Sequence, residues 1–193
     1  MYKKSEVLFG IDKALPEITR TGKAFVVEGY MDWIAAWNAG IKNVVASCGT
    51  SFTDNHAKIL KRHVKKITFL FDGDKPGREA LERSIPKALE ADLTVSVIVL
   101  PNDQDPDDFF KAGGKLENIK PMSGLIYLES INFEMSDTYK KLLRLERLEA
   151  GMLWFAANNS DVAAVLAKRG KLHELFDADT SAVLSDQLHE RSE

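Results

Sequence analysis

The chain has 193 residues, of which 45% are hydrophobic and 28% are charged, which suits one compact domain of ordinary size. No apolar run reaches the roughly 18 residues of a membrane span, and the first residues lack the apolar core of a secretory signal. We therefore expect a cytoplasmic protein without a membrane partner. The single cysteine, Cys48, excludes a disulfide framework and a cysteine-rich zinc site.

The net charge of −3 arises from 26 Lys and Arg against 29 Asp and Glu, a balance that does not favour nucleic-acid binding. Setting aside the six acids that are assigned below to a metal site leaves 23 acids against 26 bases, a net charge of +3. The overall charge therefore does not exclude a nucleic-acid partner, because the distribution of charge matters more than its sum.

Predicted strands and helices alternate along the chain. Trp33, Ile34 and Trp37 lie at helical spacing, and we expect the tryptophans in the core. Thr53 is an expected N-cap, and Pro76 fits a first helical turn. The pattern predicts strands at 24–28, 43–47, 67–71 and 94–100, and helices at 11–20, 32–38, 54–64, 79–90 and after residue 108. This order predicts an α/β fold with a parallel sheet of about four strands, flanked by helices.

Three of the predicted strands run into acidic loops. Glu28 ends the first strand, Asp72 and Asp74 follow the third, and Asp105 and Asp107 follow the fourth. Because the carboxyl ends of parallel strands meet at one edge of the sheet, we expect these loops to share one rim. Taken alone, Glu28 has two equally favoured interpretations, a site residue or a cap of the next helix.

The convergence of these acids predicts a metal site. Crowded carboxylates raise one another's pKa and oppose folding unless a cation neutralises them. Oxygen ligands without His or Cys favour Mg²⁺ or Mn²⁺ over zinc, and the four histidines are too scattered to form a metal cluster. Such ions commonly hold substrate phosphates, so the acids predict nucleotidyl or phosphoryl transfer with two or more ions.

A loop of small residues, Cys48-Gly49-Thr50-Ser51, follows the second predicted strand. Such a loop can approach a phosphate closely. A plain turn between strand and helix is an equal alternative.

The order and spacing of these motifs resemble the Toprim domain of bacterial DnaG-type primases, over about residues 2–114. Lys75-Pro76 and Cys48 depart from the usual family pattern. The segment 4–10 is similar to the basic segment that precedes Toprim in that family. The motifs that carry the resemblance are Val27-Glu28-Gly29-Tyr30-Met31-Asp32, Ala46-Ser47-Cys48-Gly49-Thr50-Ser51, Phe71-Asp72-Gly73-Asp74 with Gly77-Arg78, and Leu100-Pro101 with Asp105-Pro106-Asp107.

The resemblance implies a function and a role for each site residue. The family makes short RNA primers on a single-stranded DNA template from ribonucleoside triphosphates, with Mg²⁺ or Mn²⁺, beside the replicative helicase. Glu28 would be the catalytic acid or base near the attacking hydroxyl and a metal ligand, and Lys4 and Arg78 would contact nucleic acid or triphosphate. Asp72 and Asp74 would bind the principal ion, and the further metal positions would be completed by Asp32, Asp105 and Asp107.

The resemblance also predicts the division of the chain. We expect a lead-in segment at 1–23, a Toprim domain at 24–116 and a small all-helical subdomain at 117–193. In the last part, apolar spacing predicts helices at 125–135, 138–158 and 162–168, and a further helix or a tail at 179–193. The zinc ribbon of the family and the first half of its polymerase core have no counterpart here, so we expect an excised fragment or a naturally shortened relative.

Several other functions fit part of the pattern. A haloacid-dehalogenase-like phosphatase would carry its Asp-x-Asp on the first strand rather than the third. A topoisomerase would need a nucleophilic tyrosine from another domain. A Toprim nuclease shares the metal chemistry and should cut DNA without nucleotides. A non-catalytic DNA-binding or assembly module should bind DNA regardless of substitutions at Glu28 and Asp72.

Overall fold

The structure is a computed structural model that describes residues 4–48, 51–101, 104–131 and 133–146. The chain divides into two compact units, Met1–Glu134 and Met135–Glu193. The division at 1–23, 24–116 and 117–193 stays a prediction. Within the second unit, residues 137–146 are helical, so the helix begins one residue before the helix predicted at 138–158. The rest of that helix, and those predicted at 162–168 and 179–193, lie outside the described residues.

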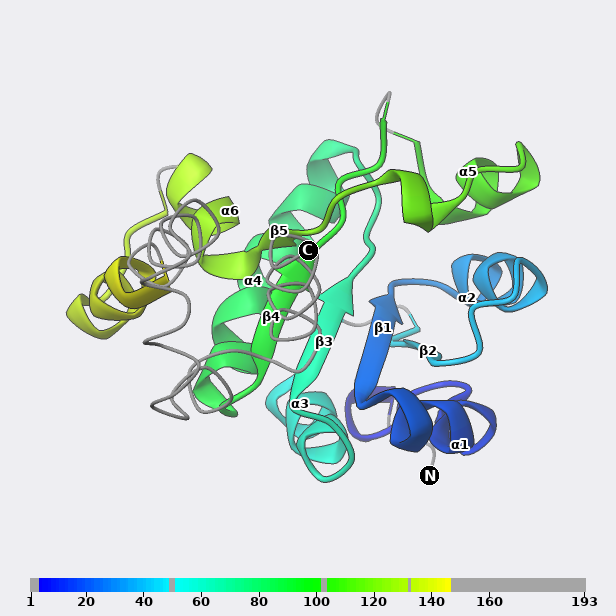
Figure 1. Cartoon of the computed structure of the whole chain (residues 1–193), viewed down its shortest axis with the longest axis horizontal. Helices are drawn as coiled ribbons and strands as arrows, with labels where there is room; N and C mark the ends of the chain where they lie inside the picture. The colour runs from blue at the N-terminus through cyan, green and yellow to red at the C-terminus, as the bar shows by residue number, and fades with distance from the viewer. Residues whose placement is uncertain (1–3, 49–50, 102–103, 132, 147–193) are drawn as a thin grey trace, which may run out of the picture. The chain divides into compact units, whose positions relative to one another are not determined.

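The first unit is built on a five-stranded sheet with the order β2-β1-β3-β4-β5 (Figure 1). The four predicted strands are present and parallel, which confirms the expected α/β fold. A fifth strand, β5, pairs antiparallel with β4 and was not predicted, because its two residues are too few to show a pattern. The strands are β1 (Lys23–Val27), β2 (Val44–Ala46), β3 (Lys66–Phe69), β4 (Thr94–Val97) and β5 (Met122–Ser123).

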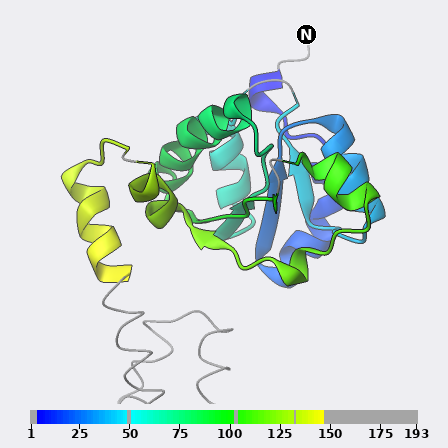
Figure 2. The ribbon, with the colours of Figure 1, turned by 90° about the horizontal axis from the view of Figure 1, so that it is seen from above.

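The helices cover both faces of this sheet. The chain moves from β1 to one neighbour through α2 and back to the other side through α3 and α4, so right-handed crossovers place α2 opposite α3 and α4. In agreement, α2 packs against α5, and α3 packs against α4 (Figures 1 and 2). The elements are α1 (Ile11–Thr21), α2 (Tyr30–Asn38), α3 (Asp54–Lys61), α4 (Lys75–Glu90), α5 (Pro106–Lys111), α6 (Gly124–Ser130) and the 3₁₀ helices η1 (Lys4–Glu6) and η3 (Leu116–Asn118).

The element ends differ from the predictions in ways that matter for the site. Helix α4 begins at Lys75 rather than at residue 79, because Asp74 caps it and Pro76 occupies its first turn. Strands β3 and β4 end at Phe69 and Val97, a few residues earlier than expected. Leu70 and Ile98, which follow them, are buried, and each donates a backbone hydrogen bond of 2.9 Å to the neighbouring strand, at Val26 and Phe69. The loop after β3 therefore begins in the core, with Leu70 and Phe71 buried, whereas Val99 in the loop after β4 is exposed.

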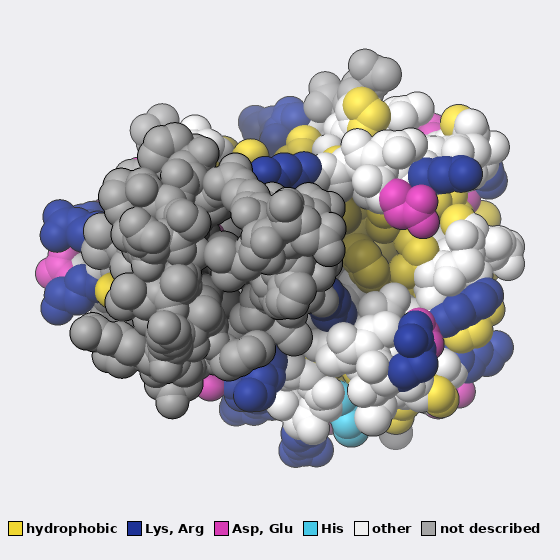
Figure 3. Space-filling model, viewed as in Figure 1, with side chains coloured by type: hydrophobic (Ala, Val, Ile, Leu, Met, Phe, Trp, Pro, Cys, Tyr) yellow, Lys and Arg dark blue, Asp and Glu magenta, His cyan; other side chains and the backbone are white. Residues whose placement is uncertain are grey.

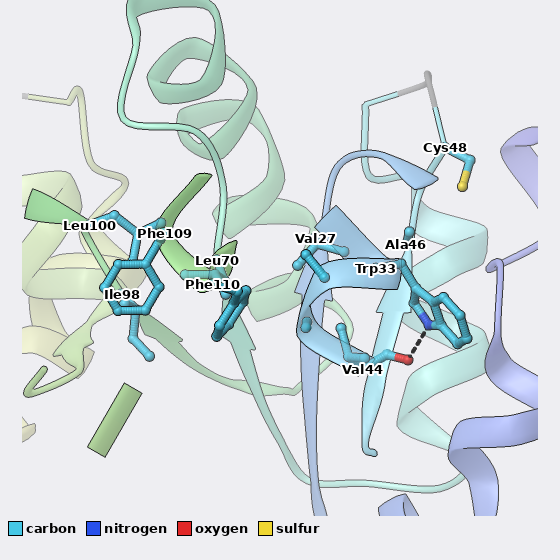
Figure 4. Packing of buried hydrophobic residues seen from close by; sticks show 12 residues of the cluster. Val27, Trp33, Val44, Ala46, Cys48, Leu70, Ile98, Leu100, Phe109 and Phe110 are labelled. Carbon is cyan, nitrogen blue, oxygen red and sulfur yellow. Dashed lines mark hydrogen bonds between the residues drawn. The ribbon is translucent and has the colours of Figure 1, made fainter. Parts of the chain in front are cut away.

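Trp33 anchors the part of the core that lies under α2 (Figure 4). Its side chain is buried, and its indole Nε1 donates a hydrogen bond of 2.8 Å to the carbonyl oxygen of Val44 in β2. Trp37 stacks on it with ring centroids 5.0 Å apart, and Phe110 of α5 belongs to the same cluster. The expected core role is confirmed for Trp33, whereas Trp37 is half-buried against the core and Ile34 is exposed. Helices α2 and α5, which carry acids of the predicted site, are thus fixed to the sheet.

Among the described residues, no helix combines the length and the apolar character needed to cross a membrane. Figure 3 shows one face of the molecule, with a hollow that has hydrophobic side chains on its floor and charged side chains around it.

Candidate metal centre

The structure places the predicted acids at the carboxyl edge of the sheet. Glu28 directly follows β1, Asp72 lies three residues beyond β3, and Asp105 stands immediately before α5. The acids lie close enough for their charges to interact. The negative charges of Asp32, Asp105 and Asp74 act on the carboxyl group of Asp72. Acids from the three loops therefore lie close enough for their charges to interact, as expected for loops that share one rim.

Three of the aspartates also cap helices. Asp32 accepts a hydrogen bond of 2.8 Å from the backbone N–H of Gly29, and Asp74 accepts one of 2.8 Å from Gly77. Asp105 accepts one of 2.6 Å from the backbone of Asp108. The caps at Asp74 and Asp105 each use one carboxylate oxygen, which leaves the second oxygen of these two groups for another partner.

Glu28 and Asp72 differ from these caps. Oε1 of Glu28 and Oδ1 of Asp72 are buried, and neither oxygen has a hydrogen-bond partner in the described part of the chain. The cap interpretation of Glu28 is wrong, because Gly29 occupies the N-cap position of α2 and Asp32 closes the first turn. Burying a carboxylate oxygen without a partner costs free energy, and a bound cation or a proton would reduce that cost for these two atoms.

The pKa values show the cost of this arrangement. Burial raises the pKa of Glu28 to about 7, and the charges of Asp72, Asp32 and Asp74 act in the same direction, against a hydrogen bond from the backbone of Asp72. Burial also raises the pKa of Asp72 to about 6, with repulsion from Asp32, Asp105 and Asp74. Burial likewise raises the pKa of Asp32. The site therefore favours neutralisation of its negative charge.

The donor set fits a hard divalent cation, since every candidate ligand is a carboxylate and two of the oxygens lack partners. In the described residues, however, no three acidic, histidine or cysteine side chains converge closely enough to enclose an ion as they stand. Mutual repulsion keeps carboxylates apart when no cation is between them. Filling the site would therefore require the side chains to rotate toward one another.

Gly77 explains why the second acidic motif needs a glycine. A β-carbon at this position would lie 2.3 Å from the backbone oxygen of Asp72 and 2.8 Å from its β-carbon. The first turn of α4 can therefore pack directly over Asp72 only when the side chain is absent. Arg78, which follows, donates a hydrogen bond to the backbone oxygen of Gly73. Its predicted contact to nucleic acid or triphosphate stays a prediction.

Asp107, another predicted ligand, takes part in an ion pair and in a backbone hydrogen bond. Its Oδ2 forms an ion pair of 2.5 Å with Nζ of Lys111, one turn later in α5. Its backbone N–H also donates to the carboxylate of Asp32, which connects α5 to α2. The sequence interpretation missed Lys111, although the spacing of four residues between an acid and a lysine in a helix would have indicated the pair.

Two further predictions concern the surroundings of the rim. The backbone N–H of Cys48 donates a hydrogen bond of 2.8 Å to the carbonyl oxygen of Glu28, so the loop after β2 begins beside the acid. Gly49 and Thr50 lie outside the described residues, and both interpretations of this loop remain open. Lys4 lies in η1, and its side chain is outside the described part of the structure.

The chain is similar to several known proteins. Residues 25–110 match a family described as Toprim-like. The DNA primase of Aquifex aeolicus (strain VF5) is 44% identical over 117 residues, which is 61% of this chain and 24% of that protein. The crystal structure of the zinc-binding and RNA polymerase domains of Aquifex aeolicus primase has a TM-score of 0.59 at 29% identity, over 98% of this chain and 42% of that one.

A DnaG primase catalytic domain bound to single-stranded DNA is also similar, with a TM-score of 0.58 and 28% identity over 79% of this chain and 51% of that chain. The matched region thus covers about a quarter to a half of these relatives.

Proposed function

We propose a function from one premise: the chain belongs to the DnaG-type primases, as a homologue of part of their catalytic domain that includes the Toprim domain. The proposed function is metal-dependent nucleotidyl transfer, in which ribonucleoside triphosphates are joined into a short RNA primer on single-stranded DNA. The observation that carries this proposal is the pair of buried, partnerless oxygens on Glu28 and Asp72 at the edge of the sheet.

Each acid has a proposed part in this chemistry. Asp72 and Asp74 would hold the principal Mg²⁺ or Mn²⁺ ion, and Asp32, Asp105 and Asp107 would complete the further metal positions. When bound, the ions would neutralise phosphate charge and orient the phosphates for in-line displacement. Asp74 and Asp105 each keep one carboxylate oxygen outside their cap for this purpose.

Glu28 is the proposed acid or base. In the metal-free protein its pKa is about 7, which is where a carboxylate can both accept and return a proton near neutral pH. Its partnerless Oε1 is the atom that would take the proton of the attacking 3′-hydroxyl. The backbone N–H of Cys48 bonds to the Glu28 carbonyl and helps to hold the residue at the end of β1.

The proposed partners follow from the relatives. Single-stranded DNA is present in the similar catalytic-domain structure, and we propose it as the template of this chain. The replicative helicase would be reached through regions of the longer relatives that this chain does not match. Lys4 and Arg78 are proposed contacts to nucleic acid or triphosphate, and the cytoplasm is the proposed location.

The experiment that tests the proposal titrates Mn²⁺ into the protein and into Asp72→Asn by calorimetry. Anomalous scattering from soaked crystals would then place the ions. We expect ions between Glu28, Asp72 and Asp74, and binding weakened by the substitution. An unchanged titration would refute the ligand assignment.

A second assay separates the possible reactions. Primer synthesis that requires both template and ribonucleotides supports a primase. Metal-dependent cutting of DNA without nucleotides identifies a nuclease. DNA binding that is indifferent to substitution at Glu28 and Asp72, without either reaction, identifies a binding module.

A further inference from the structure

A pocket of ≈ 520 Å³ lies beside the acidic rim, where the chain leaving β4 meets α5 and the connection from α5 to β5. Its size falls in the range of small-molecule sites, about 300–1,000 Å³. The residues that decide its chemistry are Val99, Pro101, Phe109, Lys115, Asn118 and Lys120. None of the six predicted metal ligands contributes to its lining. The pocket is therefore separate from the candidate metal centre, although α5 belongs to both.

Two glycines fix the wall of this pocket. Gly113 has a φ of +80°, a backbone conformation that other residues rarely adopt, and it turns the chain at the end of α5. A β-carbon on Gly114 would lie 2.5 Å from the ring of Phe109, so only glycine permits this approach. The N–H of Gly114 also donates a hydrogen bond of 2.9 Å to the carbonyl oxygen of Phe109. These two glycines therefore shape one wall of the pocket.

The lining is positively charged. Lys115 and Lys120 contribute two ammonium groups, Asn118 contributes an amide, and no acidic residue takes part. Across the residues that the structure describes, neither lysine has an ion-pair partner. Lys111, one turn before Gly114, is different because Asp107 neutralises it. Two uncompensated cations in one concave site favour an anionic ligand.

The same pocket has an apolar part. Val99 is 51% exposed, which is high for a large hydrophobic residue next to a sheet, and Pro101, Phe109 and half-buried Ile119 line the pocket with it. A purely inorganic anion would leave this surface in contact with water. A ligand with an anionic group and a flat, weakly polar ring system would use both parts of the pocket.

We propose that this pocket binds a nucleotide, with its phosphates against Lys115 and Lys120 and its base against Val99, Pro101 and Ile119. The inference rests on the proposed function, because that function brings nucleotides to the neighbouring rim. The nucleotide comes either from free nucleoside triphosphate or from a nucleic-acid strand that runs past α5. Both sources offer the same chemistry, and the experiment distinguishes them.

The test uses the absence of metal to separate the two sites. In EDTA the acidic rim repels phosphates, so nucleotide binding that persists would come from elsewhere. ATP, inorganic triphosphate and a thymidine oligonucleotide are each titrated into the chain, with binding followed by calorimetry and by amide chemical shifts. The variant is Lys115→Gln with Lys120→Gln. The matched control is Lys58→Gln with Lys65→Gln, which removes two exposed lysines of α3 and the loop after it.

We expect ATP to bind without metal and to shift the amides of Gly113, Lys115 and Asn118. The pocket variant should lose about tenfold or more in affinity, because two charge-assisted contacts are removed, while the control should bind as before. Binding by ATP alone would identify free nucleotide as the source, and binding by the oligonucleotide alone would identify a strand.

Three outcomes would overturn the proposal. The first is that neither ATP nor the oligonucleotide binds without metal. The second is that the pocket variant and the control lose the same affinity. The third is that inorganic triphosphate binds as tightly as ATP. The Mn²⁺ titration of Asp72→Asn is independent of these results. A failure of the metal site is thereby distinguished from a failure of the pocket.

Discussion

Gly77 approaches Asp72 so closely that a β-carbon would stand 2.3 Å from the Asp72 backbone oxygen. The glycine thus joins the first turn of α4 to the acid that is proposed to bind the principal ion. Because Asp74 caps the same turn through the Gly77 N–H, a displacement there would disturb both proposed ligands at once.

Gly77→Ala is therefore expected to weaken Mn²⁺ binding about tenfold or more and to lower the free energy of unfolding by about 1–3 kcal/mol, since the loop must shift to relieve the clash. Calorimetric titration and urea unfolding measure the two effects. Gly40→Ala is the control, because Gly40 has a φ of +97° but open space around it. The control should lose stability and keep its Mn²⁺ affinity. Equal Mn²⁺ affinity in both variants would refute the role of Gly77.

Asp72→Asn should stabilise the metal-free protein at neutral pH. The pKa of Asp72 is raised to about 6, so the folded state binds a proton more readily than the unfolded state. The ionised carboxyl group therefore lowers the free energy of unfolding. This destabilisation is absent below the pKa of Asp72 in the unfolded chain, grows as the pH rises and reaches its full size above a pH of about 6. After allowance for solvent screening, Asp72→Asn is expected to raise the free energy of unfolding at pH 7 by about 1–2 kcal/mol. Urea unfolding in EDTA at pH 4.5 and 7 checks it, and a gain that is the same at both pH values would contradict the assignment.

Mn²⁺ affinity should rise with pH between about 5 and 8, because protons compete with the ion for Glu28 and Asp72, whose pKa values are about 7 and 6. Binding at pH 6.5 should also release protons. Calorimetry in two buffers of different ionisation enthalpy measures this release. In Glu28→Gln the released protons should decrease, and release that is unchanged in this variant would exclude Glu28 as a titrating ligand.

Lys111→Met should increase Mn²⁺ affinity. Nζ of Lys111 lies 2.5 Å from Oδ2 of Asp107, and its positive charge also acts on Asp105 and Asp108. Removing this charge frees the carboxylate and lowers the repulsion on an incoming cation, by about 2- to 10-fold in affinity for a partly exposed pair. Lys58→Met, on α3, is the control. Weaker binding in Lys111→Met would show instead that the lysine orients Asp107 for the ion.

The sequence was most informative where apolar strands end in acids. Runs such as Ala24 to Val27, followed by Glu28, located the parallel strands and predicted the shared rim, because strand direction alone brings the carboxyl ends together. Strand β5 could not be predicted from two residues. The start of α4 was missed because the cap at Asp74 lies inside a motif that had been interpreted only as metal ligands.

The finer properties of the site depend on packing that no local pattern records. The partnerless oxygens of Glu28 and Asp72 result from burial by neighbouring loops, and the sequence only showed that acids were present. The pocket at Lys115 and Lys120 is formed by segments that meet only after folding. The contact between Gly77 and Asp72 gives a reason for a glycine that the motif contained but did not explain.

The two edges of the sheet are each covered or short. On one side, Phe9 forms an antiparallel bridge to Ala46, with backbone hydrogen bonds of 2.9 and 3.1 Å that occupy the outer side of β2. On the other side, β5 has two residues and follows Pro121, which has no N–H to donate. In the part of the chain that the structure describes, neither edge offers a long ladder of unpaired backbone groups to a second sheet. Edge-to-edge aggregation is therefore disfavoured even when the acidic rim carries no ion.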